Sequence, residues 1–222
     1  MTGLTREDVR MTTPTEPTDP RAILDRAIAT GAAVIADVQP DQLTDPTPCP
    51  DMDVRTLLGH LVGVLDRVAA LGNGEDPFAV VDTPAPGDRW GDAWSAAGRR
   101  AAEAWSDEAV LERPITLPWI QASGAEVLAT YFAELTVHTW DVATATGQAP
   151  DWDETVVIAA LEAPQIVPAE NRLAMYEEIS KEMGLDEVGV PFAEAVPVPD
   201  DAPAIDRLVA WFGRDPSLEP GG

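Results

Sequence analysis

Residues 123–147, SGAEVLATYFAELTVHTWDVATATG, place the strongest constraint on the fold because a helix is marked at both of its ends. Ser123 is followed three residues later by Glu126, which is the spacing of a capping box in the first turn of a helix. Gly147 is typical of the residue that ends a helix. The segment therefore predicts one continuous helix, the most clearly defined element of the chain.

Three further segments carry apolar residues at helical spacing and predict long helices over 19–38, 54–72 and 89–107. The first starts with an aspartate cap and a proline at the first helical position. The second follows a polar loop rich in proline that ends in a capping aspartate, either Asp51 or Asp53. Connections of about ten to twenty residues join the four helices. The pattern predicts a mainly all-α fold, a four-helix bundle with long loops.

Shorter elements are predicted around and after the fourth long helix. Residues 115–123 are too short and apolar for a helix, so we expect a brief extended segment that crosses between helices. The helical pattern over 153–184 is interrupted by Pro164 and Pro168, which predicts two pieces or a kink.

The end of the chain, residues 200–216, predicts a short C-terminal helix that is stopped by glycine and proline. The first eighteen residues are rich in threonine and proline and lack periodicity, which is typical of a flexible tail. We therefore expect a tail over 1–18, a single helical domain over 19–216 and a short tail over 217–222.

The charge of the chain limits its partners. Its 39 acidic and 14 basic residues give a formal charge of -25, which would repel phosphate backbones and anionic lipids. No apolar run reaches the roughly 18 residues of a membrane span, and the start of the chain lacks the hydrophobic core of a signal peptide. A single cysteine, Cys49, fits a reducing compartment. We expect a cytoplasmic protein that binds small molecules, with neither nucleic acid nor membrane as a partner; its oligomeric state stays open.

Both histidines of the chain fall on helix positions predicted to face inward. Glu134 precedes His138 by four residues, so the two side chains project side by side from one helix. His60 lies beside the apolar stripe formed by Leu57, Leu61 and their neighbours. Packing the two helices together would gather two imidazoles and a carboxylate, the donor set of a catalytic zinc site with an open fourth position.

Each of these residues also has a plainer interpretation. A single histidine on an apolar helix face is commonly a hydrogen-bonded core residue, and a Glu/His pair can be a solvated helix pair. Asp141 would either accept a proton from the far nitrogen of a ligand histidine or be an ordinary surface acid. Cys49 lies between two prolines in an acidic loop with nothing to lower its pKa, so we expect a structural cysteine.

Three segments taken in order resemble one family: TPCPDMDVRTLLGHLVG, AELTVHTWDVATATGQ and VPFAEAVPVPDDAPAIDRLVAWFGRDP. They are similar to actinobacterial metal-binding proteins of the DinB/YfiT-like superfamily, which are related to the N-terminal domain of mycothiol-dependent maleylpyruvate isomerase. The resemblance extends over about residues 20–216. It implies a four-helix bundle that binds a divalent metal, usually zinc, through His60, Glu134 and His138.

The resemblance does not fix the substrate, and three functions stay open. The first is an enzyme whose metal stabilises a small thiol such as mycothiol as a thiolate for S-transfer to, or isomerisation of, an electrophile. The second is metal-dependent hydrolysis, and the third is a non-catalytic metal-binding or ligand-binding protein. Arg67, about 10 Å beyond His60 along the helix, is the candidate for binding a substrate or thiol anion; the alternative is a surface arginine. We rank thiol chemistry first.

Overall fold

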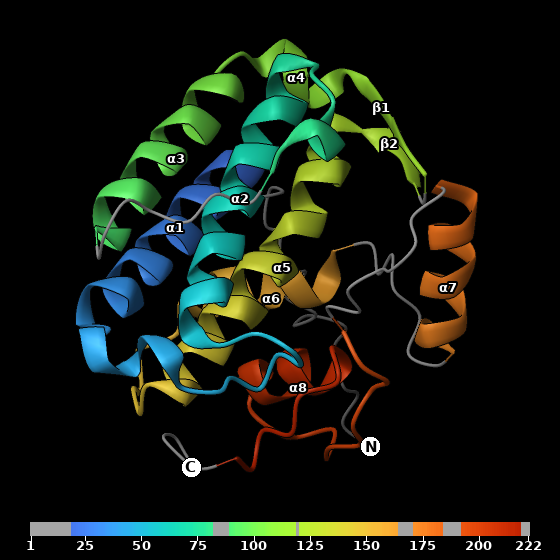
Figure 1. Cartoon of the computed structure of the whole chain (residues 1–222). Coiled ribbons are helices and arrows are strands. Elements are labelled where there is room, and N and C mark those ends of the chain that lie inside the picture. The colour runs from blue at the N-terminus through green and yellow to red at the C-terminus, as the bar shows by residue number, and fades with distance from the viewer. Residues whose placement is uncertain (1–18, 82–88, 119, 164–170, 184–191, 219–222) are drawn as a thin grey trace, which may run out of the picture.

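The computed structural model describes residues 19–81, 89–118, 120–163, 171–183 and 192–218 (Figure 1). Its long helices are α1 (Pro20–Asp37), α2 (Val54–Asn73), α3 (Trp90–Ala104) and α5 (Gly124–Ala145). The shorter helices are α4 (Glu108–Glu112), α6 (Glu154–Glu162), α7 (Arg172–Met183) and α8 (Ala204–Trp211), with 3-10 turns η1 (Pro40–Thr44) and η2 (Pro77–Ala79). The predicted mainly all-α class is confirmed. None of the helices within the described residues is long and apolar enough to cross a membrane.

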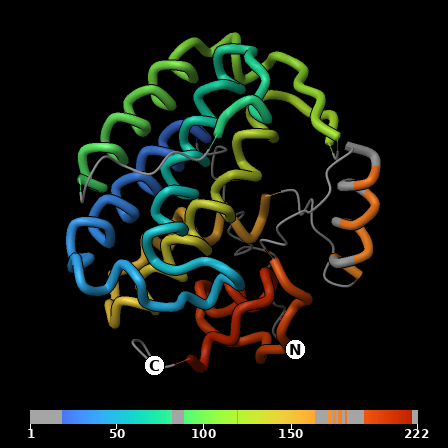
Figure 2. The backbone as a smooth tube through the Cα atoms, in the orientation of Figure 1, coloured from blue at the N-terminus to red at the C-terminus, as the bar shows by residue number. Residues whose placement is uncertain are grey.

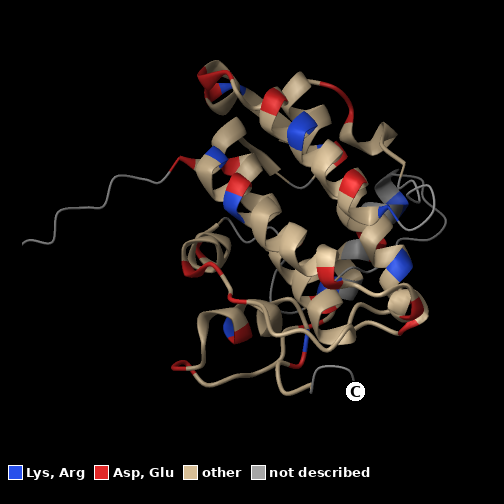
Figure 3. Cartoon of the chain, turned by 90° about the vertical axis from the view of Figure 1, so that its left-hand side faces the viewer, with Lys and Arg blue, Asp and Glu red and all other residues tan. Residues whose placement is uncertain are grey.

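The four long helices form a closed bundle. α1 contacts α3, α3 contacts α2, α2 contacts α5, and α5 returns to α1 (Figures 1 and 2). Outside this ring, α6 lies against α5 and α1, and α8 packs on α6 and α5. Acidic side chains occur on many elements in Figure 3, with basic ones among them. The acidic residues are therefore spread over several helices and loops rather than gathered in one patch (Figure 3).

The helix ends lie where the local signals predicted them. Asp19 caps α1 by accepting from the N–H of Arg21, and Ser123 caps α5 in a capping box with both of its bonds present. Of the two aspartates proposed for α2, Asp53 is the cap, since its side chain accepts from the N–H of Thr56. Side chains thus satisfy backbone donors that have no partner within the first helical turn.

Two short strands, β1 (Pro114–Leu117) and β2 (Ile120–Ser123), pair in a two-stranded sheet. The predicted extended conformation is correct, but the prediction of one segment crossing between helices is wrong. The strands pair antiparallel, with Ile115 opposite Ala122. Pairing between the two strands satisfies backbone groups that a single crossing strand would leave without partners.

The C-terminal third follows the predicted interruptions. α6 and α7 are separate helices, as the prolines predicted; Pro164 and Pro168 themselves lie outside the described residues. α8 ends before Gly213, which has a φ of 82° and approaches the backbone of Ala193 too closely for a Cβ atom. The N–H of Val196 donates to the carbonyl of Ala210, so the chain before α8 runs back along it.

Trp94 in α3 and Trp105, directly after its last residue, attach this helix to its neighbours. The Trp94 indole N–H donates to the carbonyl of Ile28 in α1 at 3.0 Å. Trp105 donates in the same way to the carbonyl of Val68 in α2 at 2.7 Å. Both side chains are buried, and Gly31 allows the Trp94 ring to lie directly against α1. The bundle therefore depends on a small residue at one close approach between helices.

This close approach can be tested at Gly31. A Cβ atom there would lie 2.5 Å from Cζ2 of Trp94, whose buried ring is held by its bond to Ile28. We expect Gly31→Ala to lower the free energy of unfolding by about 1–3 kcal/mol through overpacking, although alanine is the better helix former. Denaturant unfolding followed by circular dichroism measures the change.

The matched control is Gly91→Ala in α3, where no described atom outside the adjoining residues and the backbone of the helix itself lies within 4 Å of the added Cβ. We expect this variant to be neutral or slightly stabilised, because only helix propensity changes. An equal loss of stability in both variants would contradict the packing role of Gly31.

Candidate metal centre

His60 from α2 meets Glu134 and His138 from α5. The Nε2 atom of His60 lies 3.2 Å from Oε1 of Glu134, and Nε2 of His138 lies 3.7 Å from the same oxygen. One donor atom from each residue falls within 4.8 Å of the other two. The imidazole rings meet edge to face, with centroids 4.9 Å apart. The structure thus brings together the three residues predicted as ligands.

The packing of α2 on α5 produces this meeting. Leu57 and Leu61, on either side of His60 along α2, are buried in the core, as is Leu135 beside Glu134. On α5, the i,i+4 spacing places Glu134 and His138 on one helix face. The His138 side chain is 0% exposed, whereas His60 is 14% and Glu134 22% exposed. The cluster is closed behind His138 and reaches solvent on the side of His60 and Glu134.

The electrostatics of the cluster favour a charged carboxylate. Burial acts to raise the pKa of Glu134, but the imidazoles of His138 and His60 lower it below its usual range. Burial acts to lower the pKa of His138, but Asp141, Cys49 and Glu134 raise it well above its usual value. Without a metal, therefore, the protonated form of His138 is favoured, because its positive charge lies beside the carboxylates of Asp141 and Glu134.

The buried Nε2 atom of His138 has no hydrogen-bond partner among the described residues. Its other nitrogen, Nδ1, lies 3.0 Å from Oδ2 of Asp141. A buried imidazole held on one side and unpartnered on the other is the arrangement that a metal-ligating histidine adopts.

Asp141 is fully buried, so its alternative interpretation as a surface acid is wrong. Its two oxygens accept from Nε and Nη2 of Arg214 at 2.9 and 2.8 Å, while Oδ2 also faces His138. Burial acts to raise the pKa of Asp141, but His138 and Arg214 lower it. Sequence reasoning missed Arg214, because it lies 73 residues away from Asp141 and no local spacing connects them.

Cys49 is the second residue whose surroundings the sequence did not reveal. It is buried, and its side chain lies beside that of His138. One donor atom each of Cys49, His138 and Asp141 lies within 4.8 Å of the others. Judged from its own loop, Cys49 had no ionisable partner; the fold supplies one from α5. The signal that could have found it is its nearness in sequence to the start of α2, which carries His60.

Arg67 lies outside the donor cluster. It is partly buried on α2. Burial and Glu134 raise the pKa of Tyr131 above its usual value, and the positive charge of Arg67 acts in the opposite direction. Tyr131 precedes Glu134 by one helical turn on α5. Arg67 is therefore near the same side of the α2–α5 contact, and its role in binding an anion stays a prediction.

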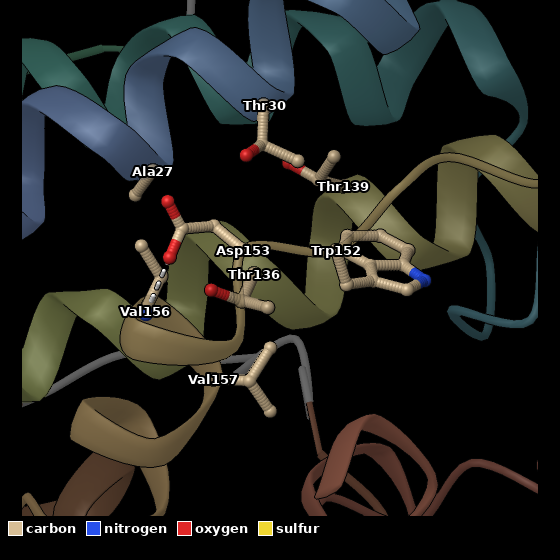
Figure 4. A pocket seen from close by; sticks show the side chains of 8 residues that line it. All are labelled: Ala27, Thr30, Thr136, Thr139, Trp152, Asp153, Val156 and Val157. Atoms are coloured by element: carbon tan, nitrogen blue, oxygen red, sulfur yellow. Dashed lines mark hydrogen bonds between the residues drawn. The ribbon is translucent and has the colours of Figure 1, made fainter. Parts of the chain in front are cut away.

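A separate pocket lies between α1, α5 and the start of α6 (Figure 4). Its lining residues are Ala27, Thr30, Thr136, Thr139, Trp152, Asp153, Val156 and Val157. Two of the polar groups here are engaged within the protein: Thr136 donates to the carbonyl of Phe132, and Asp153 caps α6 and pairs with Arg26. Thr136 projects from α5 on the opposite side to Glu134 and His138. This pocket therefore includes none of the three predicted metal ligands, His60, Glu134 and His138.

Comparison with known proteins identifies the family of the chain. The family described as the mycothiol maleylpyruvate isomerase N-terminal domain matches residues 24–143, more than half of the chain. This chain belongs to that family. The matched range contains His60, Glu134 and His138, while Arg214 lies beyond it. The family is typically metal-binding, and the chain holds residue groups that could ligate a metal.

The chain is also similar to an uncharacterized protein of Mycobacterium tuberculosis, found in the strains CDC 1551 / Oshkosh and ATCC 25618 / H37Rv. In each case the sequences are 29% identical over 196 residues, which span 88% of this chain and 98% of the relative. The similarity thus extends beyond the matched domain into the C-terminal third. No solved structure matches the chain.

The buried pair of Asp141 and Arg214 makes a prediction about stability. In metal-free protein at about pH 7, we expect Asp141→Asn to be less stable by about 3–5 kcal/mol, because Arg214 loses its anion. The folded pKa of Asp141 is lowered, so its stabilisation is fully present above roughly pH 4 and is lost as pH falls through the folded pKa. Urea unfolding over a pH series should show the difference from wild type narrowing in acid.

Asp66→Asn is the matched control, since Asp66 pairs with Arg100 in a partly exposed salt bridge. We expect a change of at most about 1 kcal/mol for this variant. A loss in Asp141→Asn that is as small as in the control, or that does not change with pH, would contradict the buried-pair account.

Proposed function

We propose that the chain binds one divalent metal, most suitably zinc, through His60, Glu134 and His138. We further propose that it uses a small thiol, mycothiol or a similar cysteinyl thiol, for S-transfer to an electrophilic small molecule or for its isomerisation. The observation that carries the proposal is the buried, unpartnered Nε2 of His138, which lies 3.7 Å from a carboxylate oxygen that also faces His60.

The residues present fit a metal. An unsatisfied buried imidazole nitrogen would be costly in a core, and a cation that accepts its lone pair removes that cost. Two imidazoles and one carboxylate are the ligands of many catalytic zinc sites and leave a position for a further ligand. Asp141 holds the far nitrogen of His138, as outer partners of zinc-binding histidines do.

The chemistry follows from the open side of the cluster. A bound divalent metal supplies positive charge that stabilises a thiolate at neutral pH. His60 and Glu134 are partly exposed, so a thiol and its electrophile approach from their side. Arg67 on the same helix as His60 would hold a carboxylate of either reactant. The thiolate sulfur would then add to an activated double bond of the electrophile, so that a C–S bond forms while the π bond breaks and its electron pair moves to the activating group. In S-transfer this adduct takes up a proton and is released; in isomerisation the resulting single bond rotates and the C–S bond breaks, which restores the double bond and the thiolate.

The surroundings of the donors favour thiol chemistry over hydrolysis. Activation of water usually relies on a general base beside the metal ligands. Here both histidines and Glu134 are assigned as ligands, and Asp141 is held by Arg214. None of the described acidic or histidine groups within the cluster is left for this task. The description of the family, which names a mycothiol-dependent isomerase, supports the same choice.

The ligand assignment predicts the metal content. Purified protein should carry about one divalent metal per chain, and alanine at His60, Glu134 or His138 should remove most of it while helical content stays largely unchanged. Affinity should fall as pH drops, because His138 holds a proton more tightly than a free imidazole and must lose it to bind metal. Metal analysis and circular dichroism measure both effects.

Glu126→Gln, an exposed acid near the start of the same helix, is the control and should keep the metal. Full occupancy in the double variant His60→Ala, His138→Ala would overturn the ligand assignment.

Thiol use is tested with cobalt in place of the native metal. Sulfur ligation to cobalt produces an intense near-ultraviolet charge-transfer band that water and carboxylate ligands do not produce. We expect this band when mycothiol or a simpler cysteinyl thiol is added, and we expect no band in His138→Ala, because the site is lost. Absorbance titration measures it.

The serine analogue of the same thiol is the matched ligand control, since it differs only in the sulfur. If the cobalt protein binds metal but no thiol changes its spectrum or speeds the loss of any electrophile, the thiol mechanism is wrong although the metal site stands.

A further inference from the structure

Arg214 is buried at the base of the candidate metal centre. Its residue surface is 2% exposed, and its guanidinium makes two hydrogen bonds to the two oxygens of Asp141. The third nitrogen, Nη1, donates to the carbonyl of Phe212, so hydrogen bonds to two different residues fix the orientation of the guanidinium. Three groups therefore lie in series: Arg214, Asp141 and His138.

Phe192 connects the same two ends of this series. Its ring stacks on the imidazole of His138, with centroids 5.4 Å apart and planes 16° apart. The guanidinium carbon of Arg214 lies 5.5 Å from the centre of the same ring. The ring of Phe212 packs on that of Phe192, with ring centroids 4.5 Å apart. The C-terminal segment thus contacts His138 through an aromatic ring and holds Asp141 through a charge.

We infer that Arg214 is a positioning residue of the candidate metal centre. It fixes Asp141 in the orientation in which the carboxylate accepts a hydrogen bond from Nδ1–H of His138, and this leaves Nε2 of His138 directed toward Glu134. The inference deepens the proposed function and rests on it, because it assigns Arg214 a task at the proposed metal site. It also makes the C-terminal segment, which lies beyond the matched family range, a part of that site.

The geometry calls for arginine at this position. Two parallel N–H groups engage both carboxylate oxygens, which fixes the plane of Asp141 as well as its place. Oδ2 keeps a second acceptor direction for His138. A lysine is a single point charge on a flexible stem and would leave that plane free to turn.

The alternative is that Arg214 only holds the C-terminal segment to the bundle. That role would change stability but not the affinity for metal in protein that stays folded. Zinc affinity, measured by competition with a chelating dye, therefore separates the two roles. Arg214→Gln should bind zinc about 10–100-fold more weakly than wild type, as expected when the outer partner of a ligand is lost.

Two matched controls and one conservative variant accompany this measurement. Arg100→Gln breaks an exposed arginine–aspartate pair between α3 and α2 and should keep wild-type affinity. Val209→Ala weakens the buried packing of α8 while Asp141 and Arg214 are unchanged, and it should also keep wild-type zinc affinity. Arg214→Lys retains the charge without the two-pronged contact, so we expect an affinity between those of wild type and Arg214→Gln.

Coupling and spectroscopy give independent readouts. Because Arg214 acts through Asp141, the double variant Asp141→Asn, Arg214→Gln should bind zinc no more weakly than the weaker single variant. In metal-free protein, the Nδ1 proton of His138 should give a slowly exchanging downfield NMR signal that Arg214→Gln loses and Val209→Ala keeps.

Wild-type affinity in Arg214→Gln, or a loss equal to that of Val209→Ala, would overturn the inference. So would additive losses in the double variant, or failure of both Arg214→Gln and Arg214→Lys to fold, which would assign a structural role. Absence of zinc binding in wild type would instead overturn the proposed function. The NMR signal of the metal-free protein would then still decide whether Arg214 fixes His138.

Discussion

Asp141 carries a negative charge and is fully buried inside the helical body. The candidate site depends on this constraint. A carboxylate in such surroundings has to be compensated, and Arg214 and His138 do so together. Arg214 comes from the end of the chain and His138 from α5, so one charge joins the C-terminal segment to the bundle. The same contact sets the orientation of an imidazole whose other nitrogen is left for a ligand.

The bundle supplies the second requirement, a fixed distance between α2 and α5. Two indole N–H groups fasten α3 to α1 and to α2, and close packing at Gly31 leaves little room for the helices to slide. With α2 and α5 held as neighbours of this closed ring, His60 faces Glu134 across their contact. Rigid helices place ligands more precisely than loops do.

The proposed metal centre therefore draws on two parts of the chain. The part that matches the mycothiol maleylpyruvate isomerase N-terminal domain contributes the three donors. The part after it contributes Arg214, which binds Asp141 beside His138, and Phe192, whose ring stacks on the imidazole of His138. The relative from Mycobacterium tuberculosis is similar over 88% of this chain, which is more than the matched domain. The donors reach solvent on the side of His60 and Glu134.

The sequence by itself determined the helices, their ends and the spacing of Glu134 and His138, because caps and i,i+4 neighbours depend only on local geometry. It also indicated His60, since apolar periodicity tells which helix face is buried. The tertiary structure alone decided that Arg214 meets Asp141, that Cys49 lies beside His138 and that β1 and β2 pair with each other. These contacts join positions that no local period relates. They arise only when the packing of the whole core selects which buried groups become neighbours.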